Sequence, residues 1–62
     1  MWELIQVSVG PAMHRGRYRV EGSRIVLEWR GGRTATSCGH LRPEIVAEAR
    51  LRQLVSSERL AA

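Results

Sequence analysis

Residues 15–38 read RGRYRVEGSRIVLEWRGGRTATSC, and this stretch decides the fold that the chain is expected to adopt. Two glycine-containing pairs, Gly22-Ser23 and Gly31-Gly32, separate three short segments in which polar and apolar residues alternate. Such pairs accept the positive φ angles of tight β-hairpin turns. Alternation with a period of two is typical of strands that bury one face. The stretch therefore predicts three antiparallel strands joined by two-residue turns.

These turns also predict which residues lie opposite one another. With two-residue turns at both positions, Tyr18 pairs with Leu27, Leu27 pairs with Thr36, and Arg30 pairs with Arg33. Side chains alternate along a strand, so this pairing gathers the apolar residues on one face of the sheet. That face comprises Gly16, Tyr18, Val20, Ile25, Leu27, Trp29, Thr34, Thr36 and Cys38.

Outside this stretch, the pattern predicts one more strand and one helix. Trp2–Val9 is a strand candidate, which Gly10-Pro11 separates from the next one. The four predicted strands are Trp2–Val9, Arg15–Glu21, Arg24–Arg30 and Arg33–Cys38.

After Gly39 the period changes to that of a helix running from Pro43 to about Glu58. Proline suits the first position of a helix, and Glu44 suits its positive end. Four apolar residues form a stripe that is expected to cover the sheet: Ala47, Leu51, Leu54 and Val55. The expected fold class is α+β, a three- to four-stranded antiparallel meander with one C-terminal helix packed on its apolar face.

Length and composition indicate a single domain spanning residues 1–62. Cys38 is the only cysteine, which fits a reducing compartment better than secretion. The first residues lack the basic and apolar regions of a signal peptide, and no apolar run is long enough to cross a bilayer. We therefore expect a cytoplasmic protein without membrane contact. All ten basic residues are arginine, and lysine, asparagine and phenylalanine are absent, which suggests a GC-rich and probable bacterial genome.

The second face of the predicted sheet carries the excess charge. Six arginines and two glutamates fall on it, a net charge of +4 that equals the net charge of the whole chain. This pattern fits a solvated polar face, a surface that binds nucleic-acid phosphates, or a surface for an acidic protein. The charged residues of this face are Arg15, Arg17, Arg19, Glu21, Arg24, Glu28, Arg30 and Arg33.

The predicted pairing places Arg15, Arg30 and Arg33 side by side on three neighbouring strands, where like charges destabilise a sheet. Splaying into water, a glutamate from elsewhere or a bound anion would compensate. If nucleic acid binds here, the expected contacts are Arg15, Arg17, Arg19, Arg30 and Arg33. Trp2 joins this face if Ile5, Val7 and Val9 point to the core, but a lone tryptophan is a poor platform for bases. Contact with the backbone, of DNA or RNA, is therefore favoured over base reading.

A small apolar group, Ile45, Val46 and Ala49, lies on the far side of the helix from the main stripe. One layer of packing does not bury both groups. Either a loop or the first strand covers this group, or it forms an interaction patch, such as the contact of a homodimer. The alternative to nucleic-acid binding is thus a protein-interaction or dimerising adaptor.

No residue pattern in the chain indicates catalysis. Cys38, His40 and His14 lack the paired spacing of a structural zinc site. Cys38 and His40 have no third group to orient them as a nucleophile and base. We expect no enzyme activity, no cofactor and no metal.

Overall fold

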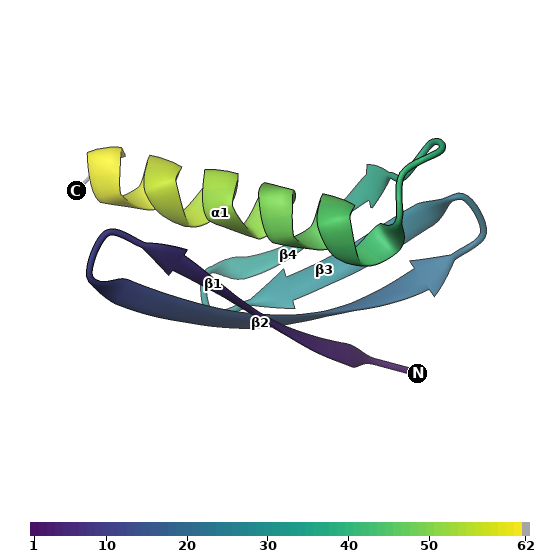
Figure 1. Ribbon diagram of the computed structural model, residues 1–62, viewed down its shortest axis with the longest axis horizontal. Coiled ribbons are helices and arrows are strands. Elements are labelled where there is room, and N and C mark those ends of the chain that lie inside the picture. The colour runs from purple at the N-terminus through teal and green to yellow at the C-terminus, as the bar shows by residue number, and fades with distance from the viewer. Residues whose placement is uncertain (62) are drawn as a thin grey trace.

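The computed structural model describes the backbone of residues 1–61 and the side chains of residues 1–57. It contains one antiparallel sheet with the strand order β1-β2-β3-β4, and a helix across one face of this sheet (Figure 1). The predicted α+β meander with a C-terminal helix is confirmed. The elements are β1 (Glu3–Val9), β2 (Ala12–Glu21), β3 (Arg24–Trp29), β4 (Gly32–Ser37) and α1 (Pro43–Ala61).

The predicted turn between β2 and β3 is correct. Gly22 and Ser23 form the turn, and Gly22 has the positive φ, 65°, that glycine adopts readily. Glu21 lies opposite Arg24 and Tyr18 lies opposite Leu27, as the two-residue turn requires.

The predicted register between β3 and β4 is wrong by two residues. The turn is made by Arg30 and Gly31, so that Trp29 pairs with Gly32 and Leu27 pairs with Thr34 instead of Thr36. A shift of two residues leaves every side chain on its predicted face, so the apolar pattern does not distinguish the two registers. The charges do, because the adopted register separates Arg30 from Arg33 and places Arg33 opposite Glu28.

Two element boundaries also differ from the prediction. β2 begins at Ala12, not at Arg15, because its first residues continue to pair with β1 after β3 has ended. The helix continues to Ala61 and does not end near Glu58.

The inner face of the sheet, which packs against α1, holds the core. Ile25 and Leu27 of β3 and Leu51 of α1 have no exposed surface. Leu51 lies so close to the sheet that a Cβ placed on Gly16 would stand 3.2 Å from its Cδ2 atom. The remaining buried residues of the core are Ile5, Val7, Tyr18, Cys38, Ala47 and Val55, with Leu54 and Trp29 partly buried against them.

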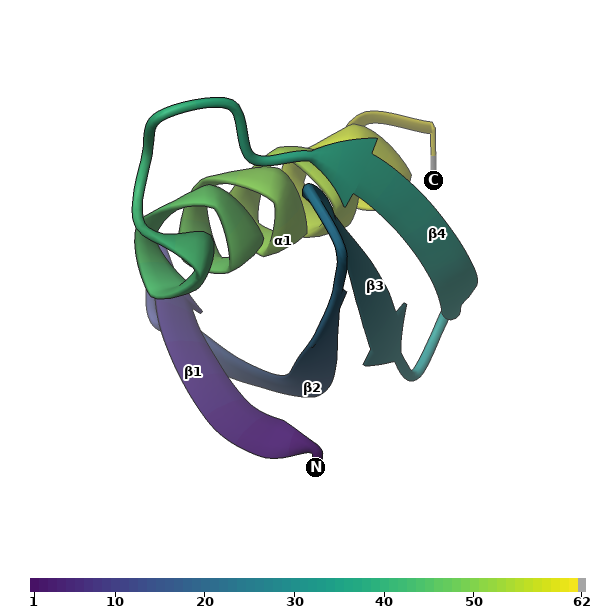
Figure 2. The ribbon, with the colours of Figure 1, turned by 90° about the vertical axis from the view of Figure 1, so that its right-hand side faces the viewer.

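The helix does not cover the sheet evenly. Its backbone approaches β1, β2 and β3 closely, whereas no Cα atom of β4 lies within 8 Å of a Cα atom of the described helix. Figure 2 shows β4 at one edge of the sheet and β1 at the other, with α1 between them. One edge of the sheet therefore lies open beside the helix. No helix in the described part of the chain is long and apolar enough to cross a membrane.

Candidate nucleic-acid interface

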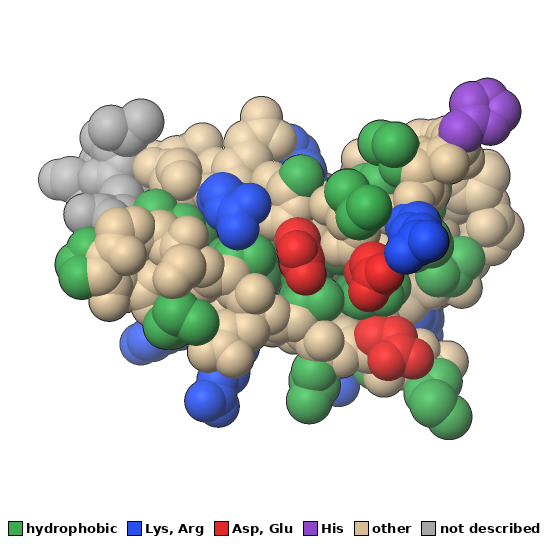
Figure 3. Space-filling view, in the orientation of Figure 1, with side chains coloured by type: hydrophobic (Ala, Val, Ile, Leu, Met, Phe, Trp, Pro, Cys, Tyr) green, Lys and Arg blue, Asp and Glu red, His purple; other side chains and the backbone are tan. Residues whose placement is uncertain are grey.

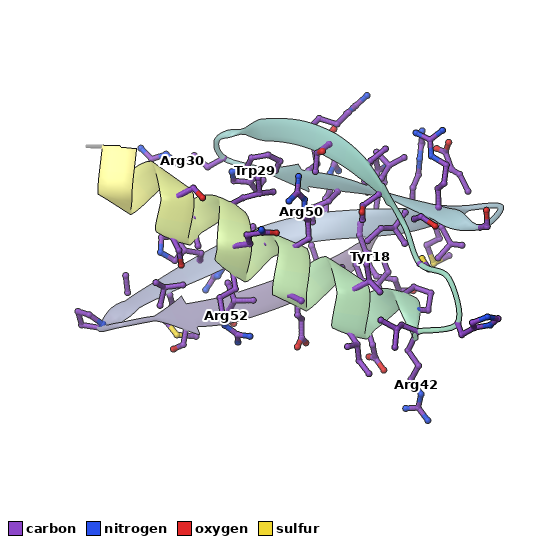
Figure 4. The ribbon with its side chains drawn as sticks, turned by 90° about the horizontal axis from the view of Figure 1, so that it is seen from above. Tyr18, Trp29, Arg30, Arg42, Arg50 and Arg52 are labelled. Atoms are coloured by element: carbon purple, nitrogen blue, oxygen red, sulfur yellow. The ribbon has the colours of Figure 1, made fainter. Side chains whose placement is uncertain are left out.

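The outer face of the sheet, opposite the helix, carries the predicted arginines. Arg15, Arg17 and Arg19 alternate along β2, and Arg24 and Arg33 extend from β3 and β4 on the same side. Arg30 lies in the turn between β3 and β4, beside Trp29 (Figure 4). The face thus spans the sheet, but its arginines have different surroundings.

Glu28 holds two of these arginines. It lies on β3 between Arg17 on β2 and Arg33 on β4, opposite both in register. The Nε and Nη2 atoms of Arg17 donate to Glu28 Oε1 at 2.9 and 2.6 Å. The Nε atom of Arg33 donates to Glu28 Oε2 at 2.8 Å, and its Nη2 atom contacts the same oxygen. These hydrogen bonds from Arg33 and Arg17 lower the pKa of the Glu28 carboxyl, so the carboxylate form is favoured.

Arg19 is held by two other groups. Its Nε atom forms an ion pair with Glu21 Oε2 at 2.5 Å. Its guanidinium also lies 4.9 Å from the ring centre of Trp2, and that of Arg17 lies 4.4 Å from the same ring. Ile5 and Val7 point to the core, so Trp2 lies on the outer face. The sequence alone left both orientations of this strand open. Its ring is therefore already in contact with two cations.

Three of the six arginines of the sheet and its turns form no ion pair with a described side chain: Arg15, Arg24 and Arg30. Arg15 lies opposite Gln6 of β1, which offers no charge. Arg24 lies opposite Glu21, but that carboxylate pairs with Arg19 instead. The predicted cluster of Arg15, Arg30 and Arg33 does not form, because Arg33 belongs to the Glu28 group.

The outer face and the β3–β4 turn together carry all of the excess charge. The group of Arg17, Glu28 and Arg33 has a net charge of +1, and the pair of Arg19 and Glu21 is neutral. The three unpaired arginines contribute the remaining positive charges. Arg24 was not among the arginines that the sequence selected, although its place at the end of the face makes it one of the three most available cations.

The hollow at the start of α1 differs in charge from the outer face. It measures about 520 Å³, and both Glu3 and Glu44 line it together with Tyr18. Burial, reinforced by Glu3, Glu44 and Glu48, raises the pKa of the Tyr18 hydroxyl. A helix N-terminus favours anions, but these carboxylates make this end of the helix unfavourable for phosphate.

The three residues considered for metal binding or catalysis have separate surroundings. Cys38 is a buried free thiol that packs in the core. His40 is exposed in the loop before α1, and His14 lies on the inner side of β2 opposite Val7. No group of three His, Cys, Asp or Glu residues suited to a metal ion occurs among the described side chains.

Comparison with protein-family models, with curated proteins and with solved structures finds no match to this chain. The geometry of the outer face is therefore the basis for the function proposed below.

Proposed function

We propose that this protein binds the phosphate backbone of nucleic acid through the outer face of its sheet, with Arg15, Arg24 and Arg30 as the primary contacts. The supporting observation is that these three arginines lack ion pairs within the described side chains. They lie on the outer face and in the adjoining β3–β4 turn, which together carry the net charge of +4. Arginine binds phosphate through two parallel hydrogen bonds when its donors are free.

The spacing of these arginines favours an extended polyanion over a small anionic ligand. Arg24 begins β3, and Arg30 follows the end of the same strand. Six residues of strand correspond to about 20 Å at roughly 3.3 Å per residue. A single phosphate group cannot contact both ends, whereas a nucleic-acid backbone presents a charge about every 1.7 Å of duplex axis.

The aromatic residues favour contact with the backbone over contact with bases. Proteins that read single strands stack bases on free aromatic rings. Trp2 already contacts Arg17 and Arg19, while Tyr18 is buried in the core. The helix packs its apolar stripe on the sheet, and residues 1–61 contain no second helix to position it for the major groove. Binding is therefore expected to be largely independent of sequence.

The paired arginines play a secondary part. Arg17 and Arg33 share the Glu28 carboxylate, so a phosphate must compete with Glu28 before it binds either of them. Their group nevertheless keeps a positive charge between the two ends of the face and adds to the long-range attraction.

The experiment is a titration of random duplex DNA and duplex RNA with the protein over a range of salt concentrations. Each neutralised phosphate contributes a log–log slope of about −0.9 for B-DNA. Three primary contacts therefore predict a slope near −3. If the wild-type protein binds neither duplex at low salt, the proposal fails, and an acidic protein becomes the expected partner of this face.

A further inference from the structure

The free edge of β4 has backbone groups that no strand satisfies within the described chain. Cys38 N donates to Ser23 O at 3.0 Å, which identifies this position as a hydrogen-bonded pair of the β3–β4 ladder. Such pairs recur at every second residue, so Thr34 and Thr36 direct their backbone groups toward β3. The N–H and C=O groups of Arg33, Ala35 and Ser37 therefore point out of the sheet.

Of the features that usually prevent strand pairing, this edge carries one, a single charged side chain. Natural edge strands are often blocked by a lysine, a proline, a bulge or a covering element. β4 has one charged residue, Arg33, and Glu28 holds its guanidinium on the outer face. The opposite side of the molecule differs, because Glu3, Glu44 and Glu48 gather near Tyr18 beside β1. Figure 3, in which β1 lies in front, shows several acidic side chains on that side.

An apolar groove adjoins the free edge. It has a volume of about 260 Å³ and lies between β4, the loop after it and α1. Leu41 and Ile45 border it and are 62% and 51% exposed, whereas Val46 packs partly against the core. The groove is lined by Thr36, Ser37, Leu41, Ile45, Val46, Ala49, Arg50 and Gln53. Two of the three residues of the expected interaction patch, Ile45 and Ala49, thus remain exposed at this groove.

Arg50 is a polar residue of the same groove. It extends from α1 on the side of β4 (Figure 4). Its Nη1 atom donates to Gln53 Oε1 at 2.8 Å, but its Nε atom is buried with no acceptor among the described residues. The same is true of His14 Nε2, which lies away from this groove. The case for a docking site therefore rests on the apolar lining of the groove and on the free edge of β4.

We propose that a second copy of this chain binds here, with its β4 strand antiparallel to the first across a two-fold axis at Ala35. Ala35 then lies opposite Ala35 of the other copy, and Arg33 lies opposite Ser37. This register joins the outward backbone groups of both strands and sets the two arginines apart. The two sheets become one continuous sheet, with both helices on the same side.

Self-complementarity selects a second copy over an unrelated partner. In the proposed register Thr34 meets Thr36 on the inner face, which is a favourable cross-strand pair. The two-fold axis brings the groove of each copy, with its Leu41 and Ile45, beside the β4 edge of the other copy. The chain also exposes 4532 Å², about 500 Å² more than the ~4,000 Å² typical of a folded monomer of its mass. An interface of standard size buries about 800 Å² on each partner, which is under a fifth of the exposed surface.

Cross-linking tests the position of the axis directly. In a Cys38→Ala background, Ala35→Cys places two thiols on residues whose Cα atoms are about 5.5 Å apart, within the range of a disulfide. We expect mild oxidation to convert this variant into a covalent dimer. Ser23→Cys, in the exposed β2–β3 turn, serves as the control for random collision. Equal yields of dimer from both variants would contradict the proposed register.

Sedimentation from micromolar to near-millimolar concentration tests the interface in the native chain. We expect the wild type to reach about twice its mass of 7.0 kDa, with a thermal midpoint that rises with concentration. Ala35→Pro removes an outward N–H, and Ile45→Glu charges the groove, so each weakens association at least about tenfold. Leu4→Glu is the matched control, because Leu4 is 86% exposed on the outer face.

A wild type that remains monomeric throughout this range, or an Ile45→Glu variant that dimerises unchanged, overturns the proposal. Association here does not require nucleic acid, so its failure and the failure of phosphate binding are distinguishable. The two also respond oppositely to salt. Phosphate binding weakens as salt rises, whereas an interface built from backbone hydrogen bonds and apolar side chains between two basic chains does not.

Discussion

The two faces of the sheet use the same strands in different ways. On the inner face, Ile25 and Leu27 are fully buried beneath Leu51, and their positions are fixed by packing. On the outer face, Glu28 forms ion pairs with Arg17 and Arg33. Arg15, Arg24 and Arg30 have no acidic partner among the described residues. The comparison teaches that a count of arginines overstates what a surface offers to a ligand. Only the cations that the protein itself does not neutralise are readily available.

The largest expected effect is on the inner face. Leu51→Ala leaves a cavity between α1 and the sheet, and such truncations cost about 2–5 kcal/mol of unfolding free energy. A domain of this size has a total stability of that order, so the variant is expected to be largely unfolded. Leu4→Ala is the matched control, because Leu4 is 86% exposed and lies away from the β4 groove. Urea unfolding of both variants measures the difference, and similar midpoints for the two would show that α1 does not pack as described.

A smaller effect is expected where the helix approaches the sheet most closely. A Cβ on residue 16 would lie 3.0 Å from the carbonyl oxygen of Glu28 and 3.2 Å from Leu51 Cδ2. Gly16→Ala is therefore expected to destabilise the protein by about 1–3 kcal/mol, as overpacking does. Because Leu51 causes part of the crowding, Gly16→Ala combined with Leu51→Val should cost less than the sum of the two single changes. Strict additivity in denaturant unfolding would contradict this contact.

The effect on stability becomes smaller still at Glu28, and it depends on pH. Hydrogen bonds from Arg33 and Arg17 lower the folded-state pKa of this carboxyl below its unfolded value. Its contribution to stability is thus fully present above the unfolded pKa of about 4.3. That contribution is lost as the pH falls through the folded pKa. Urea unfolding between neutral and strongly acidic pH should show less acid sensitivity in Glu28→Gln than in the wild type.

Glu28→Gln also changes the outer face, because it releases Arg17 and Arg33. Binding to duplex DNA should become tighter and its salt dependence steeper. Glu21→Gln is the matched control with the same change in net charge, but it releases Arg19 alone. Equal affinities of the two variants for duplex DNA would contradict the expectation that Glu28 limits the availability of Arg17 and Arg33.

The sequence was sufficient to predict the inner face, because two independent patterns agreed there. The turn at Gly22-Ser23 and the alternation of Tyr18, Ile25 and Leu27 require the same register. At the second hairpin, three positions from Arg30 to Gly32 permit two turns that keep every residue on the same face. The apolar pattern therefore does not distinguish the two registers of β3 and β4. The charges of Glu28 and Arg33 do distinguish them.

The candidate site was predicted less completely for the same reason. Sequence placed the arginines on one face, but the register decides which of them meet a carboxylate. Arg33 was expected to lie beside Arg30 and instead pairs with Glu28. Glu21 lies opposite Arg24 in register but pairs with Arg19. The open groove beside β4 depends on where α1 crosses the sheet, which periodicity within the helix does not specify.

The availability of the unpaired arginines is the central claim, and one comparison of salt slopes tests it most directly. Arg15→Gln with Arg30→Gln removes two unpaired cations from the outer face. Arg42→Gln with Arg52→Gln removes the same net charge from the region of α1, and both pairs should leave the fold intact. We predict that the first pair flattens the log–log salt slope on duplex DNA by about two units, at −0.9 per phosphate, and that the second leaves it nearly unchanged. Equal slopes for the two double variants would contradict the account, because binding would then follow net charge and not the unpaired arginines of the outer face.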